Sequence, residues 1–348
     1  GNPNLEGSHG CRRASRPGTR TPLCPDATFS AFKPWGQGAR IVADASNRGN
    51  IMDHKEFVSS LSPEQRKALT AKSDRAGLLR LFWYLAVTGV FAALVLARVP
   101  FWWVFLLPLG ICQIFLFTLN HEVIHRTVFR SQWLNDWVSR VCSMVLVLPT
   151  EWFRYFHFEH HRYTQDPERD PELFGKKPET RWEYLWHVSG IPLWIASARV
   201  VLTNALGQNK DGFVPASGRA KVANEARIML LVYAAALVAS VALQSAVLLW
   251  LWVVPVLLGQ PFLRLYLMAE HGRCAFVANM FENSRTTFTG PVIRFLAWNM
   301  PYHAEHHAYP TVPFHKLPEL HKLTAPHLRV TSEGYSKFVA ENFAKLGS

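Results

Sequence analysis

The chain has few cysteines, and none of them is placed to bind a metal or to act as a redox pair. The five show neither a CxxC pair nor the clustered spacing of an iron–sulfur site: Cys11, Cys24, Cys112, Cys142 and Cys274. Cys112 lies inside an apolar run, where a small buried thiol is the simplest interpretation. Nothing here indicates an oxidising compartment, and a metal or redox site must be built from other side chains.

Acidic residues are scarce relative to basic ones, so the chain carries a formal net charge of +12. In a soluble protein this excess would suggest binding to nucleic acid. Here the basic residues lie between long apolar runs, as they do in the cytoplasmic loops of membrane proteins. We therefore predict a membrane protein with no nucleic-acid partner.

The first fifty residues lack both a periodic apolar pattern and the pattern of a secretory signal peptide. They are rich in Gly, Pro, Ser and Arg, a composition typical of disordered chain. We predict that residues 1–51 are a disordered leader or tag and that the native start lies near Met52. Residues 52–77 are predicted to form a cytoplasmic amphipathic helix. Ser62-Pro63-Glu64-Gln65 has the pattern of a helix start, for a short helix that ends near Ser73.

The apolar runs are long enough to cross a bilayer, which takes about 20 residues per helix. Leu78–Ala97 and Phe101–Leu119 are joined by a turn at Arg98–Pro100. A third apolar block, Ile228–Met268, is too long for one helix and suits two, broken near Gln244–Ser245. These runs predict four crossings arranged as two hairpins.

Between the hairpins, residues 120–226 are polar and basic. Two apolar stretches within them, Trp133–Leu148 and Trp182–Leu206, are predicted to lie in the membrane interface, and the second is long enough for a short re-entrant span. An even number of crossings puts the termini and residues 120–226 on one side, which the basic residues mark as cytoplasmic. The predicted fold is an all-α integral membrane protein with about four transmembrane helices and a cytoplasmic helical cap. Its membrane domain covers residues 78–323, and its cytoplasmic tail covers residues 324–348.

Eight histidines occur in three short clusters beside the apolar runs. Their spacings are HxxxH, HxxHH and HxxHH, at His121 and His125, at His157, His160 and His161, and at His303, His306 and His307. Residues three and four apart share one face of a helix, so each cluster can direct two or three imidazoles at one spot. Imidazole suits Fe, Zn, Cu and Ni, and one zinc takes four ligands, so eight histidines predict a site for two metals. Six of the seven remaining histidines are interpreted as ordinary surface or core side chains: His9, His54, His187, His315, His321 and His327.

The first cluster alone also matches HExxH, the signature of zinc metalloproteases. In that interpretation Glu122 is the general base of an intramembrane protease, and a single zinc takes one further ligand from elsewhere in the chain. This alternative leaves both HxxHH clusters without a role.

Taken together, the three clusters resemble those of the membrane fatty acid desaturase and hydroxylase superfamily. The resemblance covers roughly Leu78 to Leu323, and it is closest to bacterial fatty acid desaturases in the segments His160–Pro167 and Asn299–Pro310. It implies an O2-dependent oxidoreductase that holds two non-haem Fe ions with histidines and uses O2 as its co-substrate.

The resemblance also implies further site residues. His271 stands near the end of the last apolar run, where family members carry a ninth histidine. Some members have an asparagine four residues earlier, where this chain has Leu267, and Asn299 is a candidate for a comparable polar role. Because the family's ligands are imidazoles only, the glutamates inside the clusters, Glu122, Glu159 and Glu305, are predicted to accept a ring N–H from a ligand rather than to bind metal directly. Asp166 and Asp170 precede prolines, so they either shape turns or take the same supporting role.

The implied reaction inserts a double bond into a fatty acyl chain of a membrane lipid, at a cytoplasmic site on the bacterial inner membrane. An external electron donor, ferredoxin or a cytochrome b5-like protein, is also implied, since the chain shows no pattern of its own for such a domain. Two alternatives stay open within the superfamily. One is a lipid or carotenoid hydroxylase or ketolase, and the other is a desaturase of a small polar metabolite such as dihydrorhizobitoxine. The sequence indicates neither the substrate's chain length nor the oligomeric state.

Overall fold

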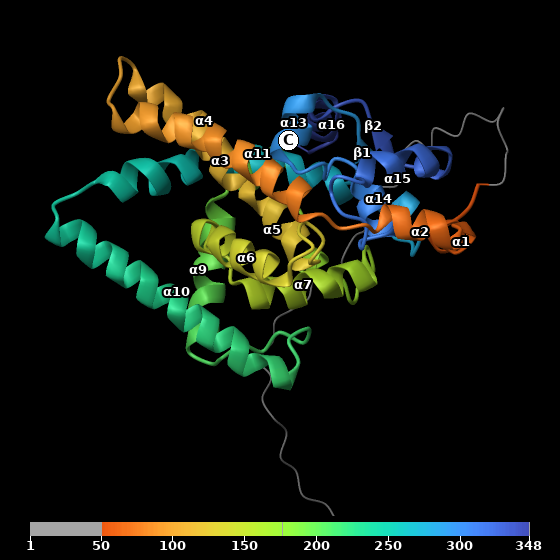
Figure 1. Ribbon diagram of the computed structural model, residues 1–348, viewed down its shortest axis with the longest axis horizontal. Coiled ribbons are helices and arrows are strands. Elements are labelled where there is room, and N and C mark those ends of the chain that lie inside the picture. Colours follow the sequence, from red (N-terminus) through yellow and green to blue (C-terminus); the bar gives the residue numbers. More distant parts are fainter. Residues whose placement is uncertain (1–50, 176, 348) are drawn as a thin grey trace, which may run out of the picture. The chain divides into compact units, whose positions relative to one another are not determined.

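The computed structural model describes residues 51–175 and 177–347, which fall within one compact unit of residues 37–348. These residues are mostly helical with very little strand (Figure 1), which confirms the predicted all-α class. In the described ranges the two strands are short: β1 (Thr286–Thr287) pairs in parallel with β2 (Thr331–Ser332). The predicted leader, residues 1–50, lies outside the described residues.

Three helices open the described chain: α1 (His54–Ser60), α2 (Pro63–Leu69) and α3 (Asp74–Leu96). The predicted start of α2 is confirmed, because Ser62 and Gln65 form a reciprocal capping box. The predicted end of this helix near Ser73 was wrong, because α2 ends at Leu69. Residues 52–77 were predicted as one helix but contain more than one. Ser73 does not close α2. Its side chain accepts the Ala76 N–H and caps α3.

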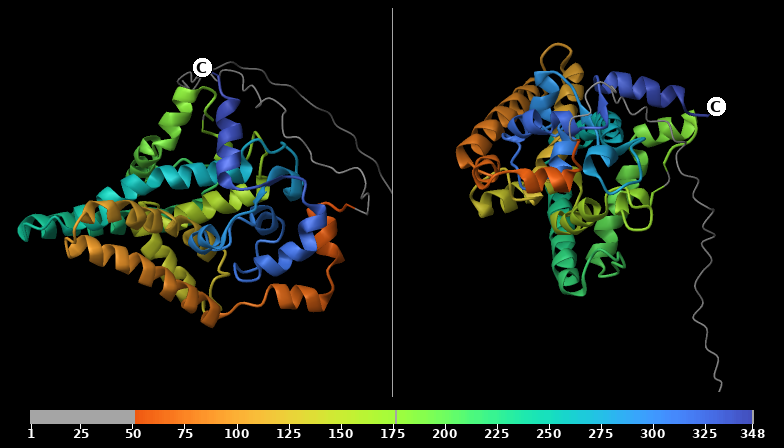
Figure 2. Two further views of the ribbon diagram at one scale, coloured as in Figure 1. Left: turned by 90° about the horizontal axis from the view of Figure 1, so that it is seen from above. Right: turned by 90° about the vertical axis from the view of Figure 1, so that its right-hand side faces the viewer.

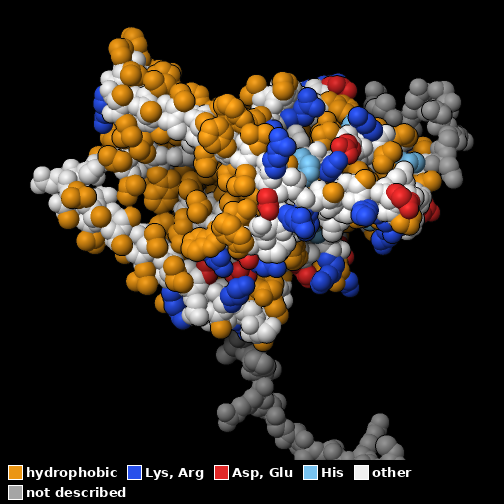
Figure 3. Space-filling model, in the orientation of Figure 1, with side chains coloured by type: hydrophobic (Ala, Val, Ile, Leu, Met, Phe, Trp, Pro, Cys, Tyr) orange, Lys and Arg blue, Asp and Glu red, His pale blue; other side chains and the backbone are white. Residues whose placement is uncertain are grey.

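Within the described residues, four helical stretches are long and apolar enough to cross a membrane, which agrees with the predicted number. They are Pro63–Leu96, Trp102–Ile124, Ala216–Ala242 and Leu249–His271. The second contains η1 (Trp102–Phe105), α4 (Leu106–Ile114) and α5 (Leu116–Ile124), and the fourth contains a π-helical turn, η3 (Leu249–Val253), and α11 (Val254–His271). Hydrophobic side chains cover the end of the molecule formed by α3, α4 and α10, and Lys and Arg gather towards α7, α14 and α15 (Figure 3).

The third span differs from its prediction at its start. Helix α10 (Ala216–Ala242) begins twelve residues before the apolar block, directly after Pro215. Hydropathy identifies only the part of a helix that lies in lipid, so it could not predict the polar first turns of α10. The predicted break near Gln244–Ser245 is confirmed, because α10 ends at Ala242 and Gln244 has a positive φ of 48°.

The second and fourth spans pack closely, although they belong to different predicted hairpins (Figures 1 and 2). Gly110 on α4 faces Pro255 and Gly259 on α11 so tightly that a Cβ on either glycine would collide with the other helix's backbone. Small residues permit such close approach of membrane helices. Helix α10 instead packs on α9 (Ile191–Ala205), which follows α8 (Arg181–Val188) across a 54° bend.

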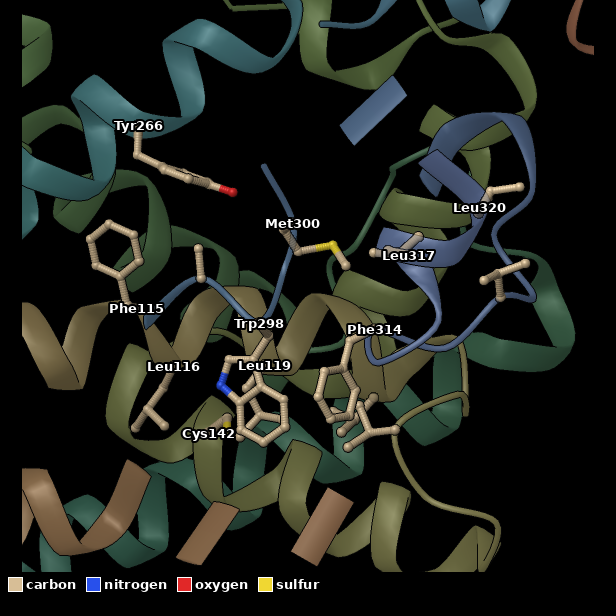
Figure 4. Close-up of a cluster of buried hydrophobic side chains, with 14 of the residues drawn as sticks. Phe115, Leu116, Leu119, Cys142, Tyr266, Trp298, Met300, Phe314, Leu317 and Leu320 are labelled. Atoms are coloured by element: carbon tan, nitrogen blue, oxygen red, sulfur yellow. The ribbon is translucent and has the colours of Figure 1, made fainter. Parts of the chain in front are cut away.

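The remaining elements form the cap that holds the polar residues. They are α6 (Gln132–Leu146), α7 (Thr150–Tyr163), η2 (Pro171–Leu173), α12 (Met280–Asn283), α13 (Pro291–Leu296), α14 (His303–Ala308), α15 (Leu317–Thr324), η4 (Ala325–His327) and α16 (Tyr335–Ala344). A hydrophobic cluster joins helix α6 and helices α12 to α16 of this cap to the spans (Figure 4). In it Trp298 is fully buried, with its ring 5.0 Å from that of Phe314 and packed with Leu119 of α5. The segment predicted as a tail contains α16, which packs on α11.

Candidate metal centre

Helices carry all three histidine clusters to one place. The first lies at the end of α5, the second on α7 and the third on the short helix α14. Spacings of three and four residues put the rings of a cluster on one side of its helix, as the sequence predicts. His271, the last residue of α11, joins them from the fourth span. All nine predicted ligands therefore lie in one cluster of rings.

Five of the rings form one group, which we call the five-histidine group. Their nearest ring nitrogens all lie within 4.8 Å of one another: His121, His125, His157, His161 and His306. Nε2 of His125 lies 2.9 Å from Nε2 of His157. Every cluster contributes to this group, so no single helix could form it alone.

The other four rings form a second group, the four-histidine group. Ligand atoms of His160, His271 and His307 lie within 4.8 Å of one another. His303 completes it, because its Nε2 lies 2.8 Å from Nε2 of His271. The two groups adjoin through His161 and His307, whose stacked rings have centroids 4.1 Å apart.

The donor set fits metal ions. Several buried ring nitrogens have no hydrogen-bond partner among the described residues, including both nitrogens of His161 and of His306 and Nε2 of His307. A buried nitrogen without a partner is costly unless something binds it. Ring nitrogens that converge within 4.8 Å and point at no protein acceptor are suited to a cation such as Fe or Zn.

Burial also keeps most of these rings neutral, which a metal ligand requires. Burial lowers the pKa of His125 to about 3. Burial, reinforced by neighbouring imidazoles, holds the pKa well below the usual value in His157, His161, His303, His306 and His307. His160 differs. Burial opposes its charging, but the carboxylates of Glu172 and Asp170 outweigh that effect and raise its pKa.

Carboxylates lie behind several rings on the side away from the ligand atoms. Asp170 Oδ1 lies 2.9 Å from Nδ1 of His160. Glu270 Oε1 lies 3.4 Å from Nδ1 of His303, and Glu122 Oε2 lies 3.7 Å from Nδ1 of His306. Such partners set the tautomer and the orientation of a metal-binding ring. Sequence reasoning missed Glu270, although its position beside His271 was a usable signal.

The other predicted polar residues lie away from the ligand rings. Glu159 pairs with Arg162 at 3.2 Å, and Asp166 accepts the Glu168 N–H at 3.0 Å within a turn. Asn299 has a positive φ of 60° and donates to the Phe314 carbonyl at 2.9 Å. These placements give no support to a role for the three residues at the centre.

Glu305 lies in the third cluster but faces away from the ligand atoms. It is fully buried, and its two oxygens are held by the Thr286 hydroxyl and by Nδ1 of His321. It therefore ties α14 to β1 and α15. His321 was interpreted from the sequence as an ordinary surface or core residue, and no spacing marks it, because its contact with Glu305 depends on the tertiary fold.

Comparisons with known proteins bear on this centre. The sequence model of a family described as fatty acid desaturase matches residues 97–337. An sn-1 oleoyl-lipid 12-desaturase of Picosynechococcus sp. is 30% identical over 32% of this chain, and the match spans about a third (34%) of that relative. One with the same name from Anabaena variabilis is 24% identical over 82% of this chain and 72% of its own length. A dihydrorhizobitoxine desaturase of Bradyrhizobium elkanii is 27% identical over 69% of this chain and 71% of its own length.

Proposed function

Because the chain belongs to the fatty acid desaturase family, whose model matches residues 97–337, we propose that it is a membrane-bound, O2-dependent desaturase that inserts a double bond into a fatty acyl chain. The observation that carries this proposal is the convergence of nine imidazoles in a five-histidine and a four-histidine group. The spans beside the centre suit a lipid substrate, and two relatives that are 12-desaturases of oleoyl lipids support an acyl chain.

The two groups of histidines would each hold one Fe ion. Iron ions there, with O2, would supply the oxidising power needed to remove two hydrogens from adjacent methylenes, which no side chain can supply. The protein's own part is to keep the imidazoles neutral by burial and to orient them through carboxylates. Asp170 does this for His160, and Glu270 and Glu122 lie behind His303 and His306.

The zinc protease alternative receives no support. Its general base would be Glu122, but Oε1 of that residue accepts hydrogen bonds from the Phe314 N–H and the Thr127 hydroxyl, both at 2.8 Å. Its other oxygen, Oε2, is buried and faces Nδ1 of His306 at 3.7 Å, behind a candidate ligand rather than beside the ligand atoms where a metal-bound water would lie. That reaction would also leave most of the nine imidazoles idle.

A small polar substrate is the second candidate, favoured by a buried polar stripe on α11. Gln260 is fully buried with both amide atoms unpartnered in the described chain, and Nε of Arg264, one turn closer to His271, is also unpartnered. Such groups would favour a substrate with polar atoms that lie along α11. The match to a dihydrorhizobitoxine desaturase over 69% of this chain adds to that case.

Mass spectrometry of lipids and small metabolites tests both candidates. Cells expressing the protein would be compared with cells expressing His306→Ala, and with His315→Ala as a control whose ring lies outside both groups. A loss of two hydrogens in acyl chains supports the proposal, and the same loss in a polar metabolite supports the second candidate. A gain of one oxygen would replace both with a hydroxylase. Iron per chain, measured on the purified proteins, should fall in His306→Ala only.

We also place the centre and both termini on the cytoplasmic side of the bacterial inner membrane, with an external donor supplying electrons. The basic residues outside the spans support this orientation. A periplasm-dependent phosphatase fused after residue 348 should be inactive, and one inserted at Gln244–Ser245 should be active. The reverse result would invert the proposed topology.

A further inference from the structure

Two polar side chains of α11, Gln260 and Arg264, lie in line with the metal centre, and we call them the polar stripe. Gln260, Arg264 and His271 fall within about 40° of one another around the helix axis, because successive residues are about 100° apart. At a rise of about 1.5 Å per residue, Arg264 lies about 10 Å and Gln260 about 16 Å from His271 along the axis. The face of α11 that ends at a candidate ligand therefore carries an amide and a guanidinium within a mostly apolar span.

The buried polar atoms of the stripe have no hydrogen-bond partner in the described part of the chain. Gln260 is fully buried, and both of its amide atoms lack a partner. Nε of Arg264 is buried and lacks one as well. Leaving such groups unpaired is costly, so native proteins rarely do so without a binding role for them. We therefore expect these atoms to bind a group that comes from outside the chain.

The bend between α8 and α9 lies against the stripe. Gly190 at this bend has a positive φ of 75°, and a Cβ there would lie 2.1 Å from Cγ of Gln260. Helix α8 packs on α11, and it exposes Trp182 and Trp186, which are 79% and 53% exposed. Exposed tryptophans are typical of the membrane–water interface. The stripe is thus next to a helix suited to the level at which the polar ends of lipids lie.

The charges around Arg264 indicate which group would bind there. The carboxylates of Glu172 and Glu270 are near enough to attract it, but no ion pair or hydrogen bond joins either to it in the described residues. Both carboxylates lie beside rings of the centre instead, Glu172 at 3.9 Å from Nδ1 of His160 and Glu270 at 3.4 Å from Nδ1 of His303. They offset part of the arginine's charge, so the stripe suits a group with at most one negative charge. A carboxyl group, free or esterified, meets that condition and offers oxygens to both side chains.

We propose that Gln260 and Arg264 form a subsite for the carboxyl end of the substrate, where both side chains donate hydrogen bonds to its oxygens. This inference rests on the proposed function, whose acyl substrate carries a carboxyl group that is free or esterified. Binding that end about 10 Å from His271 along α11 fixes which carbons of the chain reach the centre. The stripe therefore contributes to the position of the double bond as well as to affinity.

The test measures binding to the purified full-length protein in detergent, without turnover. Oleate, methyl oleate and 1-octadecene are probes that share a long chain but differ at one end, and norleucine is a small amino acid. The variants are Arg264→Gln, Arg264→Lys and Gln260→Met, in which the unbranched Met replaces an unbranched side chain. Arg199→Gln, on an exposed arginine of α9, and Gln208→Met, on an exposed glutamine just after α9, are matched controls.

The wild type should bind at least one carboxyl probe more tightly than 1-octadecene. Arg264→Gln should lose about 10- to 100-fold in affinity for that probe and none for 1-octadecene, and Arg264→Lys should lose less. Gln260→Met should lose about 3- to 10-fold, and both controls should match the wild type. A loss with oleate alone would support a free carboxylate, and a loss with methyl oleate would support an ester. The same losses with norleucine would support the subsite and assign the carboxyl to a small polar substrate.

Melting temperatures without a probe give a second readout, which a structural role for the arginine would change. Arg264→Gln and Gln260→Met should melt at or above the wild-type temperature, because each removes an unpartnered polar group. A lower melting temperature in Arg264→Gln with no selective loss of the carboxyl probes would show that Glu172 or Glu270 holds the arginine, and would overturn the proposal. Equal losses with 1-octadecene, or unchanged affinities in all three variants, would overturn it too, the latter with water as the occupant of the stripe. If Arg264→Gln cannot be purified, Gln260→Met decides by the same comparison.

Product analysis separates this inference from the proposed function. If cells expressing the wild type and Arg264→Gln make equal amounts of the same desaturated product, the subsite fails and the function stands. If carboxyl probes bind through the stripe but cells expressing the wild type make no desaturated product, the proposed function fails and the subsite stands.

Discussion

Gly110→Ala should push apart the two spans that bring histidines to the centre. A Cβ at Gly110 would lie 3.1 Å from Cα of Pro255 and closer still to its carbonyl group. A Cβ at Gly259 would lie 2.9 Å from the Ile111 nitrogen and closer to the Gly110 carbonyl. These are backbone atoms, which cannot rotate aside. Carbon atoms in contact normally lie about 3.5–4.0 Å apart, so the helices would have to separate by about 0.5 Å or more.

The expected cost follows from two opposing effects. Overpacking a tight contact costs up to about 3 kcal/mol, while alanine favours a helix over glycine by about 1 kcal/mol. The free energy of unfolding of the variant should therefore be about 2 kcal/mol lower than that of the wild type. Distances from a metal to its ligands tolerate only about 0.2 Å. Because α5 carries His121 and α11 ends at His271, the separation should also reduce the metal bound per chain.

Unfolding in detergent and the metal content of each purified variant measure both effects. Gly89→Ala is the matched control, since Gly89 lies inside α3 with nothing within 4 Å of its added Cβ. That variant should be as stable as the wild type or slightly more so. The double variant Gly110→Ala with Gly259→Ala should cost less than the sum of the two, because both act on one contact. The reasoning fails if Gly110→Ala behaves like Gly89→Ala in both measurements.

Three further predictions concern the contacts around the centre. His321→Ala should cost about 1–3 kcal/mol and lower the bound metal by leaving buried Glu305 short of a partner, with partial rescue by His321→Gln; a variant with full metal and unchanged unfolding would contradict this. Asp170→Asn should weaken metal affinity about 10- to 100-fold in chelator competition, because His160 loses its anionic partner; equal affinity would count against that role. The metal-free protein should lose stability as pH falls from 7 to 5. Rings such as His125, with a folded pKa of about 3, stay neutral in the folded protein, while the same rings in the unfolded chain take up protons below about pH 6.5. Melting temperatures that do not change with pH would refute this prediction.

Much of the architecture could be predicted because its signals are local. The length of an apolar run decides whether a helix can cross a bilayer, and a spacing of three or four decides which rings share a helix face. His271 is the instructive exception. It has no histidine nearby in the sequence, so only the resemblance to a known family pointed to it.

The division of the nine rings into two groups could not be predicted. His160 and His161 are neighbours on α7, yet His161 belongs to the five-histidine group and His160 to the other. Successive residues on a helix point about 100° apart, so adjacent histidines must face different partners. Which partners they meet depends on how α7 and α14 pack. The same holds for the carboxylates, because Glu122 and Glu305 look alike in sequence and only packing turns one of them away.

Each of the two histidine groups includes residues of the third sequence cluster, and this has a consequence for the order in which the protein can mature. His306 completes one group and His307 belongs to the other, so both histidine groups stay incomplete until the chain has been synthesised past residue 307. Since synthesis runs from the N-terminus, all four candidate spans of the described residues precede that point. A ribosome-bound chain would therefore insert its spans before either proposed metal site is complete, and metal loading would be a late step after insertion.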